Sequence, residues 1–193
     1  MTTVRAFIAI DLPDILRERL RSLAADLQPR FEELPIRWVP VDNIHLTLRF
    51  LGDVSPSNLA LIEDILHNEC AAAAPFELHV EGLGLFPNAR RPRVIWVGVD
   101  GGEQLPQLQQ RLEAGVVRLG YPAEQRAFSP HLTLGRVQRS ANTRQQRQVA
   151  DIIGQHQVGL LETAAVNEVA LFKSELNPDG AVYTKLAVAT LQI

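Results

Sequence analysis

The sequence predicts a duplicated fold, in which two copies of a strand-helix-strand-helix-strand unit are fused around a common cleft. The main observation is a repeated pentapeptide, because Ile44-His-Leu-Thr-Leu48 returns as Pro130-His-Leu-Thr-Leu134, with the two histidines 86 positions apart. Further predicted elements fall on the same offset, and no linker rich in Gly, Ser or Pro separates the copies. Several elements on one offset indicate a repeat rather than a chance match.

Strand-like and helical patterns follow one another in the first copy. Alternating apolar residues predict strands over 4–10, 37–39, 44–51 and 76–80. Apolar residues at helical spacing predict helices over about 14–29 and 55–73. The segment Asp11-Leu-Pro-Asp14 is expected to supply a turn and a cap, and Ser55 or Ser57 is expected to cap the second helix. We expect Gly52-Asp53 to break the chain after the third strand.

The second copy repeats this order. The offset lays the strand at Phe7 onto the strand at 93–94, and the helix start at Ser55 onto Ala141. Strands are predicted over 94–99, 128–137, 166–173 and 182–191, and helices over 105–119 and 141–155. Asn177-Pro-Asp-Gly180 predicts the turn of a hairpin between the last two strands. We therefore expect one two-lobed domain over 1–193, with repeats at about 4–82 and 93–175 and a final strand to 191.

Composition limits the classes of function. The chain has 193 residues, of which 46% are hydrophobic and 21% charged, as in an ordinary globular protein. A net charge of -3 argues against a protein that coats duplex DNA, although local arginines can still hold an anionic end group. The single Cys70 excludes an internal disulfide framework, and its place at a predicted helix end favours a structural thiol. The first segment is too short for a signal peptide and no apolar run is long enough for a membrane span, so a soluble, cytoplasmic protein is expected.

The repeated pentapeptide carries the predicted chemistry. Side chains two apart in a strand share a face, so His45 and Thr47 point one way, and His131 and Thr133 repeat that arrangement. Set about a two-fold axis, the copies place two imidazoles opposite each other across a groove. A neutral imidazole can take a proton from water while an imidazolium donates one to a leaving oxygen, and histidine supplies both forms near neutral pH. The threonine hydroxyls can donate hydrogen bonds to phosphate oxygens, and the scheme requires no metal or other cofactor.

Neither the remaining histidines nor a metal site is favoured by the sequence. His67, His79 and His156 fall on a helix, a strand and a helix end without repeating, so they carry no prediction. A site in which His45 and His131 bind a metal is disfavoured, because neither motif face carries a carboxylate and metal sites usually recruit one.

Further segments allow a family to be named. They are Arg5-Ala-Phe-Ile-Ala-Ile-Asp-Leu-Pro13, Asn43-Ile-His-Leu-Thr-Leu-Arg-Phe-Leu-Gly52, Phe86-Pro87, Arg93-Val-Ile-Trp96, Phe128-Ser-Pro-His-Leu-Thr-Leu-Gly-Arg136, Ser174-Glu-Leu-Asn-Pro-Asp-Gly180 and Tyr183. With them the chain resembles the two-histidine phosphoesterases, and within these the LigT-like RNA 2',3'-cyclic phosphodiesterases, also called 2'-5' RNA ligases. The resemblance covers nearly the whole chain, with no departure at a motif position.

The resemblance implies a bilobal α+β fold whose two antiparallel sheets line a central cleft, with helices on the outside. The implied reaction is metal-independent hydrolysis of an RNA-terminal 2',3'-cyclic phosphate to a 2'-phosphate, with His45 as proton donor and His131 as proton acceptor. If a 5'-hydroxyl replaces water, the same geometry implies reversible, ATP-independent 2'-5' ligation. The expected partners are RNA ends or small cyclic nucleotides, with no membrane and no obligate protein partner, for a chain expected to be a monomer.

Several residues outside the two His-x-Thr motifs each have two interpretations. Arg136 matches a family arginine that binds substrate phosphate, yet strict alternation puts it opposite His131, so either Gly135 permits a bulge or Arg136 is structural. Arg49 shares a face with His45 by alternation, and Phe7 either stacks on a base or belongs to the core. The last group is a basic cluster that either guides an RNA tail or lies in a solvated loop: Arg90, Arg91 and Arg93.

Two other functions are kept as alternatives. One is a related two-histidine phosphodiesterase that acts on another cyclic phosphate or on a 2'-5' oligonucleotide. The other is a non-catalytic RNA-binding module, which the intact His and Thr in both copies disfavour.

Overall fold

The order of helices and strands largely follows the predicted strand-helix-strand-helix-strand repeat. The structure is a computed structural model that describes residues 3–177 and 180–192. Its helices are α1 (Asp14–Leu27), α2 (Pro56–Ala71), α3 (Gln104–Arg118) and α4 (Thr143–Gln155), with short 3-10 turns η1 (Gln28–Phe31) and η2 (Val41–Asn43). Its strands are β1 (Val4–Ile10), β2 (Ile36–Trp38), β3 (Leu46–Val54), β4 (Phe76–Phe86), β5 (Val94–Asp100), β6 (His131–Val137), β7 (Leu160–Val166), β8 (Glu168–Asn177) and β9 (Gly180–Thr190).

The strands form two antiparallel sheets, and each sheet takes strands from both halves of the sequence. One sheet has the order β3-β1-β8-β9, and the other has the order β2-β6-β5-β4-β7. We call the first sheet and its helices lobe A, and the second lobe B. β4 leaves the first half to pair with β5 in lobe B, and β8 leaves the second half to pair with β1 in lobe A.

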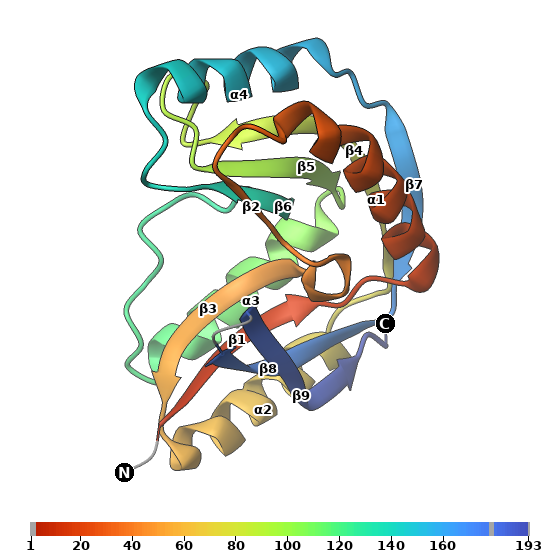
Figure 1. The fold of residues 1–193 in the computed structure, drawn as a ribbon. Coiled ribbons are helices and arrows are strands. Elements are labelled where there is room, and N and C mark those ends of the chain that lie inside the picture. Colours follow the sequence, from red (N-terminus) through yellow and green to blue (C-terminus); the bar gives the residue numbers. More distant parts are fainter. Residues whose placement is uncertain (1–2, 178–179, 193) are drawn as a thin grey trace.

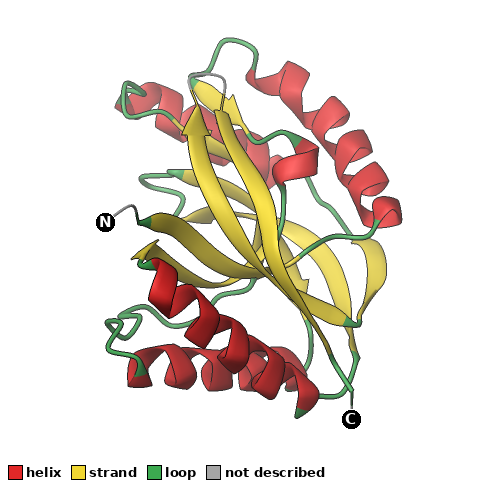
Figure 2. Ribbon diagram, turned by 90° about the horizontal axis from the view of Figure 1, so that it is seen from below, coloured by secondary structure: helices red, strands yellow, loops and turns green. Residues whose placement is uncertain are grey.

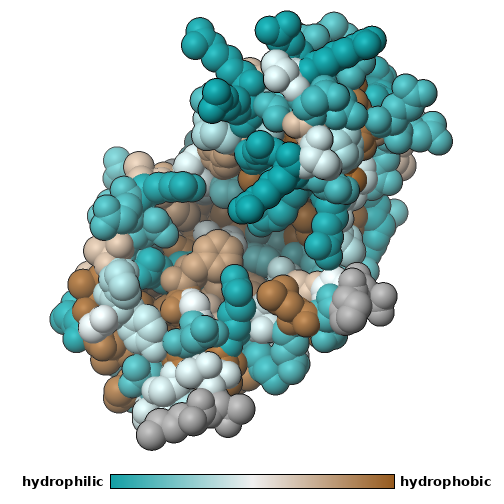
Figure 3. Space-filling view, turned by 60° about the vertical axis from the view of Figure 1, so that its left-hand side comes forward, coloured by the Kyte–Doolittle hydropathy of each residue, from teal (hydrophilic) through white to brown (hydrophobic). Residues whose placement is uncertain are grey.

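The helices are exchanged in the same way. α2 and α3 pack together against the outer face of lobe A, whereas α1 packs on β7 and α4 packs on β4 in lobe B. The strands therefore lie in the middle with the helices outside them (Figures 1 and 2). A hollow with apolar surface inside hydrophilic rims separates the two lobes on the face seen in Figure 3. The predicted duplicated α+β fold with two sheets around a central cleft is confirmed.

Several strand predictions were wrong in extent, and one strand was missed. Gly52 and Asp53 do not break the chain, because both stay in β3 and pair with Ala6 and Arg5. β4 continues past Val80 to Phe86, with Gly82 at a φ of 70° where its register to β5 shifts. β7 was not predicted at all, since residues 160–166 lack a clear alternation and the strand lies at the edge of its sheet.

The predicted caps were partly right. Ser55 caps α2 by accepting a hydrogen bond from the backbone N–H of Asn58 at 3.3 Å. Asp11 does not cap α1, whose N-cap is Pro13 without a side-chain hydrogen bond. The Asp11 carboxylate instead pairs with Arg17 and Lys185. Of the predicted hairpin turn, Pro178 and Asp179 lie outside the described residues, while β8 and β9 pair up to Asn177 and Gly180.

The apolar residues divide between two clusters that reflect the two faces of lobe A. One large core runs through both lobes between the sheets and their covering helices, and on β1 it takes Ala6, Ile8 and Ile10. The opposite face of β1 contributes Phe7 and Ala9 to a small second cluster with Ala170, Phe172 and Tyr183. This second cluster faces the cleft, and it forms the floor on which the first motif histidine rests.

Candidate active site

His45 lies directly before β3, and one of its ring nitrogens forms a hydrogen bond with the backbone. Its Nδ1 is 2.9 Å from the carbonyl oxygen of Asn43. Because a carbonyl oxygen can only accept, Nδ1 carries a proton, and Nε2 is the free nitrogen of the neutral ring. The Asn43 side chain in turn donates to the carbonyl oxygen of Ala181 on β9 at 2.9 Å, which ties this turn to the other side of the lobe A sheet.

His131 repeats this arrangement at the start of β6. Its Nδ1 donates to the carbonyl oxygen of Ser129 at 2.7 Å, two residues earlier as for His45 and Asn43. Each copy therefore presents an imidazole whose Nδ1 is bound to the backbone and whose Nε2 is left to accept or donate a proton.

Aromatic rings hold both imidazoles. His45 stacks on Phe7 with ring centroids 4.6 Å apart and meets the edge of Tyr183 at 5.2 Å. His131 meets Phe86 edge-on at 4.9 Å and lies 6.4 Å from Trp96. These contacts fix the ring orientations in addition to the backbone hydrogen bonds.

The two motif strands contain the same β-bulge. On β3, Ile8 of β1 pairs with Arg49 and Ala9 pairs with Thr47, which leaves Leu48 as an extra residue. On β6, Ile95 pairs with Gly135 and Trp96 with Thr133, which leaves Leu134 as the extra residue at the same repeat position. A bulge reverses the alternation beyond it, so the residue three after each threonine joins the face of that threonine.

This bulge resolves the two interpretations of Arg136. It brings Arg136 onto the face of His131 and Thr133, where the side chain is exposed while Leu134 and Gly135 are buried. The positive charge of Arg136 lowers the pKa of both His131 and His45. Its guanidinium is therefore within electrostatic reach of both imidazoles, which come from different sheets.

The two histidines differ in their other charged neighbours. Burial is the main cause that lowers the pKa of His45 below its ordinary value near 6.5, and Arg17 and Arg136 lower it further. The hydrogen bond to Asn43 and the negative charge of Asp11 raise it again. For His131, burial and Arg136 lower the pKa, and the hydrogen bond to Ser129 opposes them. Asp11 therefore favours the protonated form of His45 alone.

A small cavity of about 170 Å³ lies beside His45. Its walls include Asp11, Arg17, Tyr183 and Lys185. Asp11 accepts from Arg17, and its other oxygen lies 2.7 Å from Lys185 Nζ. These charges hold the pKa of Asp11 below its ordinary value against the effect of its burial, so the carboxylate that faces His45 stays ionised.

Arg49 does not share the face of His45, contrary to the alternation. The bulge turns it to the opposite face, where it is 7% exposed and its Nε lies 2.8 Å from Glu113 Oε2. It also donates to the carbonyl oxygen of Pro122. Arg49 is thus a buried structural residue that holds the loop leading toward His131.

Exposure also decides between the two interpretations of Phe7, whereas the role of the basic cluster stays a prediction. Phe7 is 2% exposed beneath His45, so it belongs to the core and cannot stack on a base. Arg90 and Arg91 are exposed in the loop between β4 and β5, and Arg93 donates to the carbonyl oxygen of Gln138 at 3.2 Å. Sequence reasoning gave Asp11 and Tyr183 no place beside His45, because their positions there depend on strand pairing.

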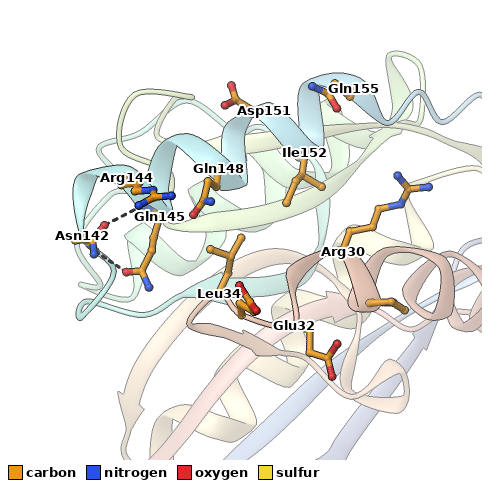
Figure 4. Close-up of a pocket in the computed structure, with 12 residues that line it drawn as sticks. Arg30, Glu32, Leu34, Asn142, Arg144, Gln145, Gln148, Asp151, Ile152 and Gln155 are labelled. Atoms are coloured by element: carbon orange, nitrogen blue, oxygen red, sulfur yellow. Dashed lines mark hydrogen bonds between the residues drawn. The ribbon is translucent and has the colours of Figure 1, made fainter.

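A larger hollow is unrelated to these residues. It measures about 830 Å³ and lies between the segment after α1 and α4, where Figure 4 shows Arg30, Glu32 and Leu34 opposite Arg144 and Gln148. Charges of both signs line it, and neither histidine does. In residues 3–177 and 180–192, no cluster of three or more His, Cys, Asp or Glu could hold a metal ion. Nor does any helix within those ranges have the length and apolar character needed to cross a membrane.

The fold and the paired His-x-Thr strands define the class of the protein, that of the two-histidine phosphoesterases. Residues 10–96 and 97–183 each match the family model described as LigT like phosphoesterase. The chain therefore belongs to the LigT-like phosphoesterase family.

Individual relatives cover nearly the whole chain. A protein from Methanothermobacter thermautotrophicus named RNA 2',3'-cyclic phosphodiesterase is 37% identical over 188 residues, which are 97% of this chain and 99% of the relative. One of the same name from Archaeoglobus fulgidus is 33% identical over 96% of this chain and 99% of its own. Among solved structures, TT0787 of Thermus thermophilus superposes with a TM-score of 0.82 at 31% identity, over 97% of this chain and 98% of its own. E. coli LigT complexed with 3'-AMP superposes with a TM-score of 0.79 at 27% identity, over 99% of each chain.

Proposed function

We propose that this protein hydrolyses RNA-terminal 2',3'-cyclic phosphates to 2'-phosphates, with His45 as general acid and His131 as general base. The observation that carries the proposal is the matched pair of imidazoles, each with Nδ1 bound to a backbone carbonyl and both within reach of one arginine charge. Two imidazoles beside one cationic side chain suit a phosphodiester, which is anionic and needs one proton removed and one supplied. The relatives named RNA 2',3'-cyclic phosphodiesterase support this substrate class.

In the proposed step, water attacks phosphorus opposite the 3' oxygen. His131 Nε2 takes a proton from the water as its oxygen bonds to phosphorus. The bond from phosphorus to the 3' oxygen breaks, and His45 donates its Nε2 proton to that oxygen, which leaves a 2'-phosphate and a 3'-hydroxyl. Asp11 supports the assignment of the acid, because its charge favours protonated His45 and is not among the charges that act on His131.

Thr47, Thr133 and Arg136 are proposed to bind the phosphate. The bulged strands put one threonine beside each histidine and Arg136 beside Thr133. Hydroxyl and guanidinium donors directed at non-bridging oxygens stabilise the charge that grows in the transition state. The scheme uses no metal and no other cofactor.

The first prediction tests this mechanism directly. Each of His45→Ala and His131→Ala should lower kcat by roughly 10² to 10⁴ fold, the range for loss of a general acid or base. The assay is hydrolysis of nucleoside 2',3'-cyclic phosphates in chelator, with chromatography to separate 2'-phosphate from 3'-phosphate products. Circular dichroism of both variants serves as the folding control. Activity that survives both substitutions, or a 3'-phosphate product, would contradict the mechanism.

Finer parts of the proposal remain predictions. We expect a soluble, cytoplasmic monomer that acts on RNA ends or small cyclic nucleotides, and repeats that divide near 4–82 and 93–175. Reversible 2'-5' ligation requires only that a 5'-hydroxyl replace water in the same step. Incubation with RNA halves that carry a cyclic phosphate and a 5'-hydroxyl tests it, and failure to join them by an enzyme active in hydrolysis removes it.

A further inference from the structure

Arg37 is a second exposed arginine that lies beside Arg136. The two residues pair directly across the antiparallel strands β2 and β6, and directly opposite residues point to the same face of a sheet. Ile36 and Trp38, on either side of Arg37, face the other way, because both pack against the large core. Arg37 and Arg136 therefore stand together on the cleft face of lobe B, and both are exposed.

This pair of cations has no counterion among the described residues. None of the ion pairs that those residues form includes the guanidinium of Arg37 or of Arg136. Like charges on directly opposite residues repel each other and destabilise a sheet. An anionic ligand relieves this repulsion, and guanidinium groups bind phosphate through short, charge-assisted hydrogen bonds. The two arginines thus form a site suited to phosphate groups.

Arg37 lies further from the imidazoles than Arg136 does. The charge of Arg136 lowers the pKa of both histidines, whereas that of Arg37 is not among the charges that act on either ring. β2 is the edge strand of the lobe B sheet, and neighbouring strands lie about 4.8 Å apart. A phosphate held between the two imidazoles therefore meets Arg136, and Arg37 is left for a second anion beyond it.

The second cation gives the cleft a direction. In lobe B, β2 lies beyond the motif strand β6, whereas in lobe A the motif strand β3 is itself the edge of the sheet. Positive charge therefore extends past one of the two motif strands only. An RNA end fits this asymmetry, because its chain continues from the reacting nucleotide in one direction, with one phosphate for each further nucleotide. A free cyclic nucleotide has the reacting phosphate alone.

We propose that Arg37 binds the phosphodiester on the 5' side of the nucleotide that carries the cyclic phosphate. This inference rests on the proposed function and deepens it, because it makes an RNA end the preferred substrate over a free cyclic nucleotide. Arg37 determines specificity in this scheme, since it contacts the substrate one nucleotide away from the reacting phosphorus.

The test compares three substrates that differ in their second phosphate. They are adenosine 2',3'-cyclic phosphate, a dinucleotide of two adenosines with a terminal 2',3'-cyclic phosphate, and the same dinucleotide with a neutral methylphosphonate linkage. The first ribose of both dinucleotides is 2'-O-methylated, so that the linkage is stable. Arg37→Gln should lower kcat/KM for the charged dinucleotide by roughly 5- to 50-fold, as expected for the loss of one charge-assisted contact. The other two substrates should change by less than about twofold, because they lack the second charge.

Two variants and the salt dependence serve as controls. Arg37→Lys keeps the charge and should retain most of the preference for the charged dinucleotide. Arg147→Gln removes the same charge from an exposed position on α4, outside the lobe B sheet, and should leave all three substrates unchanged. For the charged dinucleotide, the slope of log kcat/KM against log salt concentration should become shallower by about 0.7 in Arg37→Gln, as for one lost phosphate contact on a single strand.

A binding measurement separates this inference from the proposed function. Calorimetry with the charged and the neutral dinucleotide, each ending in a 2'-phosphate, reports affinity without turnover. Binding that weakens in Arg37→Gln for the charged dinucleotide alone supports the second phosphate site even if the wild type hydrolyses no cyclic phosphate, and in that case the proposed function alone fails. Equal losses on all three substrates would place Arg37 at the reacting phosphate. That result, or unchanged kinetics and binding of the charged dinucleotide, would overturn the second site and leave the hydrolysis intact.

Discussion

Asp11 and Arg136 act in opposite directions on the pKa of His45, whereas of these two only Arg136 acts on His131. Arg136 lowers the pKa of both histidines, while Asp11 raises that of His45. Catalysis through a pair of identical groups needs one of them protonated and the other neutral at the same pH. Asp11 biases His45 toward the protonated form, against burial and the charge of Arg17, and it supports the proposed assignment of His45 as the acid.

A second prediction follows for the titration of these rings. Asp11→Asn should lower the pKa of His45 and leave that of His131 unchanged, because the lost negative charge acts on His45 alone. Arg136→Gln should raise the pKa of both rings, because it removes a nearby positive charge from each. NMR titration of the ring Cε1 protons measures both effects without turnover. Equal shifts of the two rings in Asp11→Asn would contradict the assignment of His45 as acid.

The same shifts fix the pH range in which kcat/KM is highest. Both pKa values lie below the ordinary value near 6.5, so the form with one proton on the pair is most populated below that pH in the free enzyme. Loss of Arg136 should move the surviving activity to higher pH. The lowered pKa values also affect stability. As the pH falls, the histidines of the unfolded chain are protonated before those of the folded protein, so the free energy of unfolding decreases as the pH falls below about 6.5.

Arg49 gives a third prediction, on stability. Its side chain is 7% exposed, against 38% for that of Arg111, whose Nε lies 3.5 Å from Glu69 Oε2. Arg49→Met leaves Glu113 without its partner and frees the loop at Pro122, so we expect a loss of about 3 kcal/mol in the free energy of unfolding. Arg111→Met removes a half-exposed pair whose Glu69 keeps Arg118 as a partner at 3.8 Å, and it should cost less than about 1 kcal/mol. Urea unfolding of both variants measures the difference, and equal losses would show that Arg49 does not hold the loop at Pro122.

At the scale of the element, the bulges mark the limit of what the sequence could predict. Alternation correctly placed His45, Thr47, His131 and Thr133 on shared faces, since these residues precede the bulges. Beyond each bulge the alternation gives the wrong face, which is why it misplaced Arg49 and put Arg136 opposite His131. In the second copy, Gly135 indicated a possible bulge. The equivalent residue of the first copy is Arg49, which gives no such indication, and only the strand pairing shows that both strands contain a bulge.

The antiparallel pairing of β4 with β5, in which Gly84 lies opposite Trp96, supports the second imidazole and gives a fourth prediction. A Cβ at Gly84 would overlap the indole of Trp96, which lies near His131 and Phe86. Gly84→Ala should therefore displace Trp96, with a loss of about 1–3 kcal/mol in stability from overpacking and a lower kcat. Tryptophan emission reports the displacement of Trp96, urea unfolding measures the loss of stability, and the cyclic phosphate assay measures kcat.

The matched control is Gly154→Ala in α4, where a new Cβ meets nothing within 4 Å. Alanine is the better helix former, so this change should stabilise the protein by roughly 0.5–1 kcal/mol and leave kcat unchanged. A Gly84→Ala enzyme with wild-type kcat and emission would show that Trp96 does not support His131.

At the scale of the whole molecule, the two halves of the sequence are not the two lobes. β4 and α1 come from the first half and build lobe B, while β8 and α3 come from the second half and build lobe A. The offset in the sequence showed that the unit is repeated, but it could not show the exchange, because which strands pair is decided by the three-dimensional packing. The exchange means that each histidine is held by contacts from both halves, as with His45 of the first half against Tyr183 of the second.

Because the two lobes exchange strands and helices, we expect them to unfold together. Each lobe contains a natural probe of its unfolding. Trp38 and Trp96 both lie in the lobe B sheet, on β2 and β5. Cys70 is buried in α2 on lobe A, where burial raises the pKa of its thiol to about 12 and keeps it unreactive until that lobe opens. In a urea titration, tryptophan emission and the reaction of Cys70 with a disulfide reagent should therefore share one midpoint, as two-state unfolding requires. Cys70→Ala supplies the background of the thiol assay and should leave the fluorescence transition cooperative. Labelling of Cys70 at urea concentrations where the emission is still native would show that lobe A opens alone, and that the exchanged strands and helices do not couple the two halves of the cleft.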